Sequence, residues 1–96
     1  MYIRNATVTA AIGLHARPAA VFVRAVTRTG LPVTLAKPGQ PAVDATSLLQ
    51  VMTADFGCGC EVVLSVPDIG HDDLAVRTAL DALADLLSTD LVHGPD

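Results

Sequence analysis

The sequence predicts one α+β domain in which helices cover one face of an antiparallel sheet. Three observations support this fold class. Segments with strand patterning alternate with segments of helical periodicity, close turn signals separate them, and 96 residues are enough for a single core. The expected order is strand, helix, strand, strand, helix, strand, helix. We assign this domain to residues 1–90 and expect residues 91–96 to form a frayed tail.

The first strand and the first helix flank a turn. Residues 2–9 include threonines that alternate with small apolar residues, which is typical of a half-buried strand. Gly13 then allows an unusual backbone turn. From Ala16 to about Arg28 apolar residues recur at helical spacing, and Gly30 marks the helix end.

The other strands are short and are separated by turn signals. Residues 31–36 predict a second strand with Leu31, Val33 and Leu35 on one face. A proline- and glycine-rich turn at 38–41 precedes a short returning strand at 42–44. Residues 61–66 form the most convincing strand pattern in the chain.

Two further helices complete the pattern. A short helix runs from Ser47 to about Ala54, with Thr46 or Asp44 available as its N-cap. The last helix begins at Asp72 and Asp73, where the helix dipole favours negative charge. Its apolar stripe consists of Val76, Ala79, Leu80, Leu83, Leu86 and Leu87.

Composition and charge argue against several classes of function. Hydrophobic residues make up 51% of the chain and aromatic residues only 3%, so aliphatic side chains must build the core. A net charge of −4, with six scattered basic residues, disfavours nucleic-acid binding. No apolar run approaches the roughly 20 residues of a membrane span, and no signal peptide follows Met1. Two cysteines are too few for a disulfide scaffold, so we expect a reduced, cytoplasmic protein without membrane insertion. We also expect it to be a monomer.

The start of the first helix combines residues suited to binding a phosphoryl group. If His15 is the N-cap, the unpaired backbone N–H groups of Ala16 and Arg17 point towards its ring. Arg17 adds a permanent charge and a donor fork that fits phosphate oxygens. Pro18 falls in the first turn, where its missing N–H is harmless. A neutral histidine is a competent nucleophile, and a phosphoryl group on its ring nitrogen nearer the backbone is expected to lie within reach of those N–H donors.

A simpler interpretation is that His15 only caps the helix and Arg17 is a solvated charge. Taken one at a time, the two residues favour that interpretation. Their joint occurrence within Gly13-Leu14-His15-Ala16-Arg17-Pro18-Ala19-Ala20 favours the phosphoryl acceptor instead. The small alanines also leave room for a partner to approach.

This octet resembles the active-site signature of the HPr family, the histidine-containing phosphocarrier proteins of the bacterial phosphoenolpyruvate-dependent sugar phosphotransferase system. The resemblance spans about residues 2–88. It implies an open-faced sandwich with a four-stranded antiparallel sheet and three helices on one side. It also implies that His15 receives phosphate from enzyme I and passes it to enzyme IIA domains, with Arg17 assisting. Such a protein is a carrier rather than an enzyme and needs no cofactor.

A second motif, Thr46-Ser47-Leu48-Leu49-Gln50-Val51-Met52, resembles the regulatory serine helix of the same family. The resemblance implies phosphorylation of Ser47 by an HPr kinase/phosphorylase in some members, although a serine there also serves as a helix cap. Some apolar side chains of this helix pack inward. The others are expected to form a docking patch for partner and regulatory proteins, made of Ala20, Val21, Leu48, Leu49 and Met52.

Two alternatives to sugar transport remain at this point. A regulatory HPr paralogue, acting in nitrogen regulation or with a dihydroxyacetone kinase, would carry the same histidine as a signal. A thiol or metal module would use Cys58 and Cys60, but their spacing does not match structural zinc motifs and His71 or His93 would have to converge with them. We therefore expect a glycine-rich loop with two incidental thiols and no metal, and His71 on the surface.

Overall fold

The computed structural model describes residues 2–9, 13–67, 70 and 72–88. The expected tail at 91–96 and His93 lie outside these residues, as does His71. The elements follow one another in the predicted order: β1 (Tyr2–Thr7), α1 (Ala16–Thr29), β2 (Thr34–Ala36), β3 (Val43–Asp44), α2 (Leu48–Thr53), β4 (Glu61–Val66) and α3 (Asp73–Leu87).

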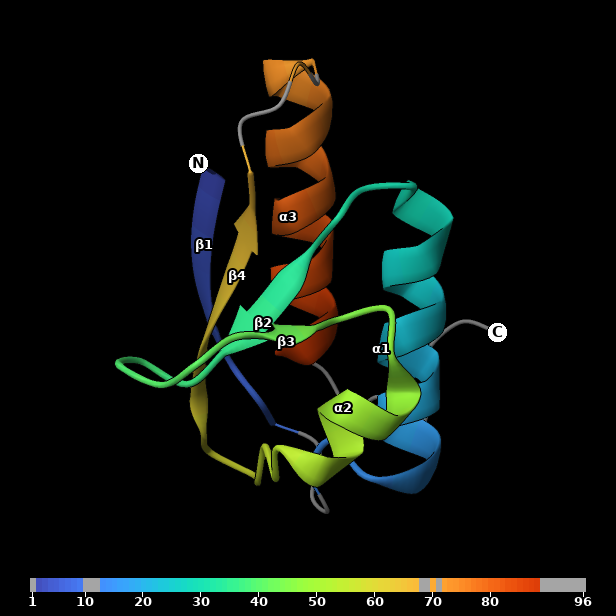
Figure 1. Cartoon of the computed structure of the whole chain (residues 1–96), viewed down its shortest axis with the longest axis vertical. Helices are drawn as coiled ribbons and strands as arrows, with labels where there is room; N and C mark the ends of the chain where they lie inside the picture. Colours follow the sequence, from blue (N-terminus) through green and yellow to red (C-terminus); the bar gives the residue numbers. More distant parts are fainter. Residues whose placement is uncertain (1, 10–12, 68–69, 71, 89–96) are drawn as a thin grey trace.

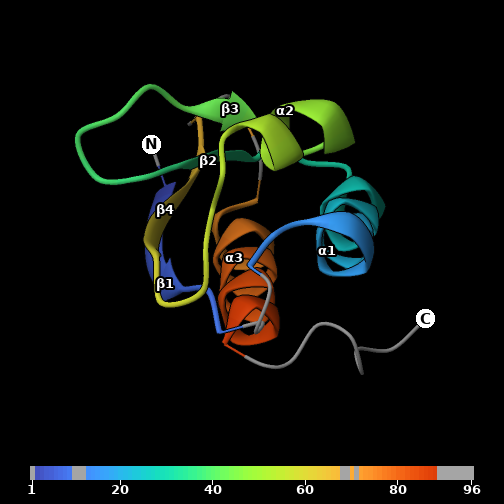
Figure 2. The same cartoon turned by 90° about the horizontal axis from the view of Figure 1, so that it is seen from below.

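The four strands form one antiparallel sheet in the order β1-β4-β2-β3. The longest pairing joins β1 to β4 and runs from Tyr2 opposite Val66 to Thr7 opposite Glu61. Figure 1 shows β4 between β1 and β2, with α3 beside the β1–β4 pair. Figure 2 shows α1 and α3 on the same side of the sheet and α2 next to β3. This arrangement confirms the predicted α+β fold.

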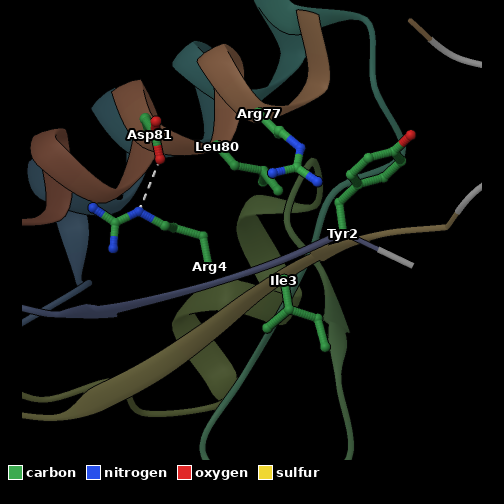
Figure 3. A pocket seen from close by; sticks show the side chains of 6 residues that line it. All are labelled: Tyr2, Ile3, Arg4, Arg77, Leu80 and Asp81. Carbon is green, nitrogen blue, oxygen red and sulfur yellow. Dashed lines mark hydrogen bonds and ion pairs between the residues drawn. The ribbon is translucent and has the colours of Figure 1, made fainter. Parts of the chain in front are cut away.

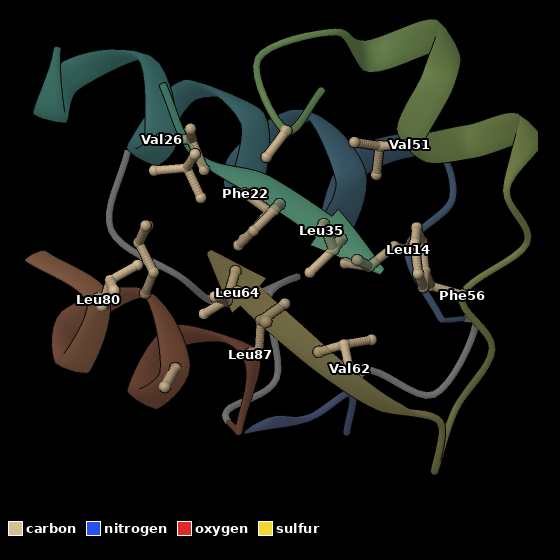
Figure 4. Close-up of a cluster of buried hydrophobic side chains, with 14 of the residues drawn as sticks. Leu14, Phe22, Val26, Leu35, Val51, Phe56, Val62, Leu64, Leu80 and Leu87 are labelled. Carbon is tan, nitrogen blue, oxygen red and sulfur yellow. The ribbon is translucent and has the colours of Figure 1, made fainter. Parts of the chain in front are cut away.

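The core lies between the sheet and the helices and is built from aliphatic side chains with two phenylalanines. Phe22 of α1 is fully buried, as are Leu35 of β2, Leu64 of β4 and Leu87 of α3 (Figure 4). Each such side chain contributes about 1.5–3 kcal/mol by leaving water. The side chains that tie α1 to the sheet therefore also hold the start of that helix, where His15 lies, in a fixed place.

The two long helices are amphipathic and bury one face each. The buried residues of α1 are Pro18, Ala19, Phe22 and Val26, and those of α3 are Val76, Leu80, Leu83, Ala84 and Leu87. Gly30 ends α1 in a left-handed conformation, with φ of 69°. In the part of the chain that the structure describes, no helix is long and apolar enough to cross a membrane.

Two strands are shorter than their sequence patterns predict. The pattern of the first extends to Thr9 but β1 ends at Thr7, because the N–H of Cys60, whose carbonyl accepts from Val8, bonds locally to the carbonyl of Gly57. The second was expected from Leu31 but begins at Thr34, because the N–H of Val33 bonds locally to the carbonyl of Leu31. In both cases a backbone donor that the ladder would need is used elsewhere.

At the β1 edge of the sheet, α3 covers one face. Arg4 of β1 reaches Asp81 of α3, with 2.9 Å between Nε and Oδ1, whereas Ile3 points to the other side of the strand (Figure 3). Ile3 is 60% exposed, so the sheet face that the helices leave open carries an apolar side chain at its edge. An exposed ion pair of this kind stabilises a fold by at most about 1 kcal/mol.

Candidate functional site

His15 lies immediately before α1, at the N-cap position that the sequence predicts. Its backbone is extended, with φ of −127° and ψ of 154°, and its side chain makes no capping hydrogen bond to the helix. The first turn of α1 contains no acidic residue. An imidazole that is 38% exposed therefore stands at the positive end of a helix dipole, where negative charge is favoured by about 0.3–1 kcal/mol.

The first turn of α1 presents some residues to solvent and buries others. Ala16 and Arg17 are exposed, whereas Pro18 and Ala19 are buried. Ala16 has φ of 50°, a left-handed conformation that costs an L-residue about 1–2 kcal/mol. Strain of this size is common at functional sites, where the surrounding packing imposes it. Here the buried pair after Arg17 anchors the first turn of α1, which directly follows His15.

The loop that carries His15 is fixed by the segment that follows α2. The N–H of Leu14 donates to the carbonyl of Phe56, with 2.7 Å between N and O. Gly13 has φ of 72°, and its α-carbon lies so close to this segment that a Cβ would be 2.5 Å from the Phe56 carbonyl oxygen. Leu14 and Phe56 are themselves buried in the core. The position of His15 thus depends on a glycine that allows two backbones to touch.

Asp55 is a neighbour of His15 that the sequence analysis missed as a site residue. Its Oδ1 lies 3.1 Å from Nε2 of His15, although the two residues are forty positions apart. Both side chains remain accessible, with 38% of the histidine and 79% of the aspartate side chain exposed. No local pattern signals such a contact. The one available clue is a carboxylate directly after a short helix, where glycine is the usual residue.

Ser47 begins α2, whose helical residues run from Leu48 to Thr53. Its Oγ accepts a hydrogen bond from the N–H of Gln50 at 3.3 Å, so the cap is Ser47 rather than Thr46 or Asp44. Asp44 instead accepts from the Oγ1 of Thr46 at 2.6 Å and from its N–H at 2.9 Å. These two bonds hold the pKa of the Asp44 carboxyl below its usual value. The regulatory role expected for Ser47 stays a prediction.

Replacing Ser47 with alanine is expected to lower the free energy of unfolding by about 1 kcal/mol, because the N–H of Gln50 loses its acceptor. Ser47→Gly should lower it by only a few tenths of a kcal/mol, since glycine is tolerated at an N-cap. Urea denaturation followed by circular dichroism measures both values. Equal losses for the two variants would show that the hydroxyl does not stabilise α2.

The residues expected to form a docking patch lie on two helices that pack against each other, α1 and α2. Leu49 is 76% exposed and Leu48 is 41% exposed, whereas Val51 is fully buried. Met52 is half-buried against the core, as is Val21, and Ala20 is also half-buried. The helix therefore divides its apolar residues between the core and the surface, as expected. The use of this surface for docking stays a prediction.

The loop that connects α2 to β4 contains Cys58 and Cys60 and pairs with the end of β1. The N–H of Gly59 bonds to the carbonyl of Val8 at 2.7 Å, and the N–H of Val8 bonds to the carbonyl of Cys60 at 2.9 Å. Cys58 is exposed, Cys60 is half-buried, and both are free thiols. Within the described ranges no three histidine, cysteine or acidic side chains are grouped so that they could hold a metal ion.

Comparison with known proteins identifies the class of this domain. The model of the family described as the PTS HPr component phosphorylation site matches residues 3–89. The phosphocarrier protein HPr of Streptomyces coelicolor is 42% identical over 93 residues, which cover 97% of this chain and 95% of that protein. The phosphocarrier protein HPr of Treponema pallidum is 35% identical over 83 residues, which cover 86% and 91% of the two chains.

The fold agrees with the sequence comparison. The crystal structure of a phosphocarrier protein HPr from Bacillus anthracis superposes with a TM-score of 0.75 at 30% identity and covers 88% of this chain and 94% of that one. The matching family model and the shared open-faced sandwich place this domain in the class of small phosphocarrier domains. This chain belongs to the HPr family of the phosphotransferase system.

Proposed function

We propose that this protein accepts a phosphoryl group on His15 from phosphorylated enzyme I and passes it to enzyme IIA domains for sugar uptake. Phosphoenolpyruvate is the ultimate donor in this scheme. The observation that supports it most directly is the N-cap position of His15, with an accessible ring and no side-chain bond to the helix. The cytoplasmic location and the monomeric state expected from the sequence stay predictions.

The environment of His15 suits a transient phosphate better than a permanent one. The helix N-terminus favours the dianion, and Arg17 adds a positive charge two residues away. However, the site is open to solvent, which weakens each of these interactions. A group that is stabilised only moderately can be transferred onwards, as a carrier requires.

Phosphorylation by enzyme I tests the proposal. The purified protein is incubated with phosphoenolpyruvate, Mg²⁺ and a catalytic amount of enzyme I, and intact mass spectrometry then measures the product. We expect the gain of one phosphoryl group, labile in acid and stable in base, as for a phosphohistidine. Site mapping is expected to place it on His15.

Because the sequence has three histidines, each is replaced with alanine as a control. His71→Ala and His93→Ala are expected to be phosphorylated normally, and His15→Ala not at all. An unmodified wild-type protein, or a label that persists in His15→Ala, would contradict the proposal. Restoration of sugar uptake in a strain that lacks its own HPr then tests the sugar branch, and failure to restore it would favour a regulatory branch.

A further inference from the structure

Asp55 occupies a backbone position that does not require a carboxylate. It follows α2 with φ of 60°, the left-handed conformation in which many helices end. Glycine adopts this conformation without strain, whereas aspartate is tolerated at some cost. The turn would therefore form at least as well with glycine. What the aspartate adds is a side chain that reaches His15, with 3.1 Å between Oδ1 and Nε2.

The chemistry of the two groups fixes the proton in this contact. An ionised carboxylate has only hydrogen-bond acceptors, so Nε2 of His15 must be the donor. A neutral imidazole has one ring proton, and its other nitrogen then keeps a lone pair. With the proton on Nε2, the lone pair is on Nδ1. This is the ring nitrogen nearer the backbone of His15.

We propose that Asp55 is a positioning residue that holds neutral His15 in the Nε2–H tautomer and so presents the Nδ1 lone pair to the phosphoryl donor. The inference rests on the proposed function, because it assigns a role in the same transfer. Since both side chains are accessible, water competes for the contact. Asp55 therefore biases the tautomer and the orientation of the ring rather than locking them.

The same contact serves the transfer step. The Nδ1 lone pair forms the new bond to phosphorus while the bond from phosphorus to the donor protein breaks, and the donor group keeps that electron pair. The proton stays on Nε2, so the ring becomes a phosphoimidazolium with a positive charge. The Asp55 carboxylate lies against that charge. When the phosphoryl group leaves for an acceptor protein, the bonding pair returns to Nδ1 and the neutral Nε2–H ring is restored.

Nitrogen NMR of the imidazole tests the tautomer without any phosphorylation. Long-range ¹H–¹⁵N correlations are recorded on ¹⁵N-labelled protein at about pH 9, where histidine side chains are neutral. The His15 signals are assigned by their absence in His15→Ala. We expect widely separated shifts in the wild type, with a proton-free Nδ1 and a protonated Nε2. In Asp55→Gly and Asp55→Asn the two shifts should move towards each other as the second tautomer becomes populated.

Asp81→Asn is the matched control. It removes the same charge from another exposed ion pair, the one with Arg4 on the far edge of the sheet. Its His15 shifts are expected to equal those of the wild type. Identical shifts in wild type and both Asp55 variants would overturn the proposal. Asp55→Gly also relieves the left-handed backbone, so a changed signal in that variant cannot be attributed to a weakened fold.

The initial rate of phosphoryl transfer from enzyme I provides the second measurement. We expect about a fivefold fall in both Asp55 variants, the largest effect consistent with one exposed ion pair, and no change in Asp81→Asn. A changed tautomer with an unchanged rate would contradict the claim that the Nε2–H tautomer of His15 favours phosphoryl transfer. If the wild type is not phosphorylated, the proposed function fails. If the wild type is phosphorylated but Asp55→Gly has the same imidazole shifts and the same transfer rate, only the positioning role of Asp55 fails.

Discussion

Replacing Gly13 with alanine is expected to lower the free energy of unfolding by about 3 kcal/mol. The added Cβ would lie 2.5 Å from the carbonyl oxygen of Phe56 and 2.8 Å from the Cα of Gly57. Both are backbone atoms, so no side-chain rotation relieves the clash. Alanine at a φ of 72° adds about 1–2 kcal/mol of strain, and separating the two segments weakens the bond from Leu14 to Phe56, worth about 1 kcal/mol.

Gly39→Ala is the matched control for this substitution. Gly39 also has a positive φ, 76°, but a Cβ there would meet nothing within 4 Å. Its replacement should therefore lower the free energy of unfolding by only about 1–2 kcal/mol, the strain alone. Urea denaturation of both variants measures the difference. If Gly13→Ala were no more destabilising than Gly39→Ala, the close approach of the two loops would not determine the position of His15.

These two glycines show what a sequence can and cannot reveal about such a site. Gly13 is recognisable as a turn residue because it interrupts a strand pattern before a helix. Its distinct role, the contact with Phe56, depends on a segment that lies more than forty residues away. Nothing in the local pattern distinguishes it from Gly39. The difference between the two positions exists only once the chain is folded.

The difference between local sequence signals and contacts made only in the folded chain also explains which site residues can be predicted. His15 was placed at the N-cap correctly because caps, the proline in the first turn and apolar periodicity are local signals. The cap of α2 stays open in the sequence, since Asp44, Thr46 and Ser47 could each serve, and only the geometry selects Ser47. Asp55 was missed altogether because its contact with His15 joins the end of one helix to the start of another.

The ends of the strands also depend on hydrogen-bond partners that the local sequence does not show. The patterns at residues 2–9 and 31–36 are those of strands throughout, yet both strands lose residues to hydrogen bonds outside the sheet. The N–H of Cys60 bonds to Gly57 within the loop that follows α2, so it does not pair with Val8 of the first segment. Periodicity reports which face of a segment is buried, but pairing is decided by which neighbour supplies an acceptor. Element order was therefore predictable, and element length was not.

Removing the guanidinium of Arg17 is expected to slow phosphoryl transfer to His15 about 100-fold while leaving the fold intact. Arg17 is exposed in the first turn of α1, so Arg17→Ala loses little packing. In the proposed transfer the positive charge of Arg17 balances the oxygens of the transferring group, and loss of one such donor typically reduces the rate by about 100-fold or more. Arg17→Lys keeps the charge but not the planar donor fork, so its transfer rate should lie between those of the wild type and Arg17→Ala.

Arg24→Ala separates a specific role of Arg17 from the general effect of charge. Arg24 is also exposed and lies two turns further along the same helix, roughly 10 Å away at 1.5 Å per residue. At an ionic strength of about 0.1 M that distance equals the screening length, so its charge is only weakly felt at His15. The transfer rate at saturating carrier concentration is therefore expected to change less than twofold. Equal losses in Arg17→Ala and Arg24→Ala would mean that the two arginines act through the attraction of acidic partners, and that the phosphoryl group at His15 is stabilised by the helix terminus instead.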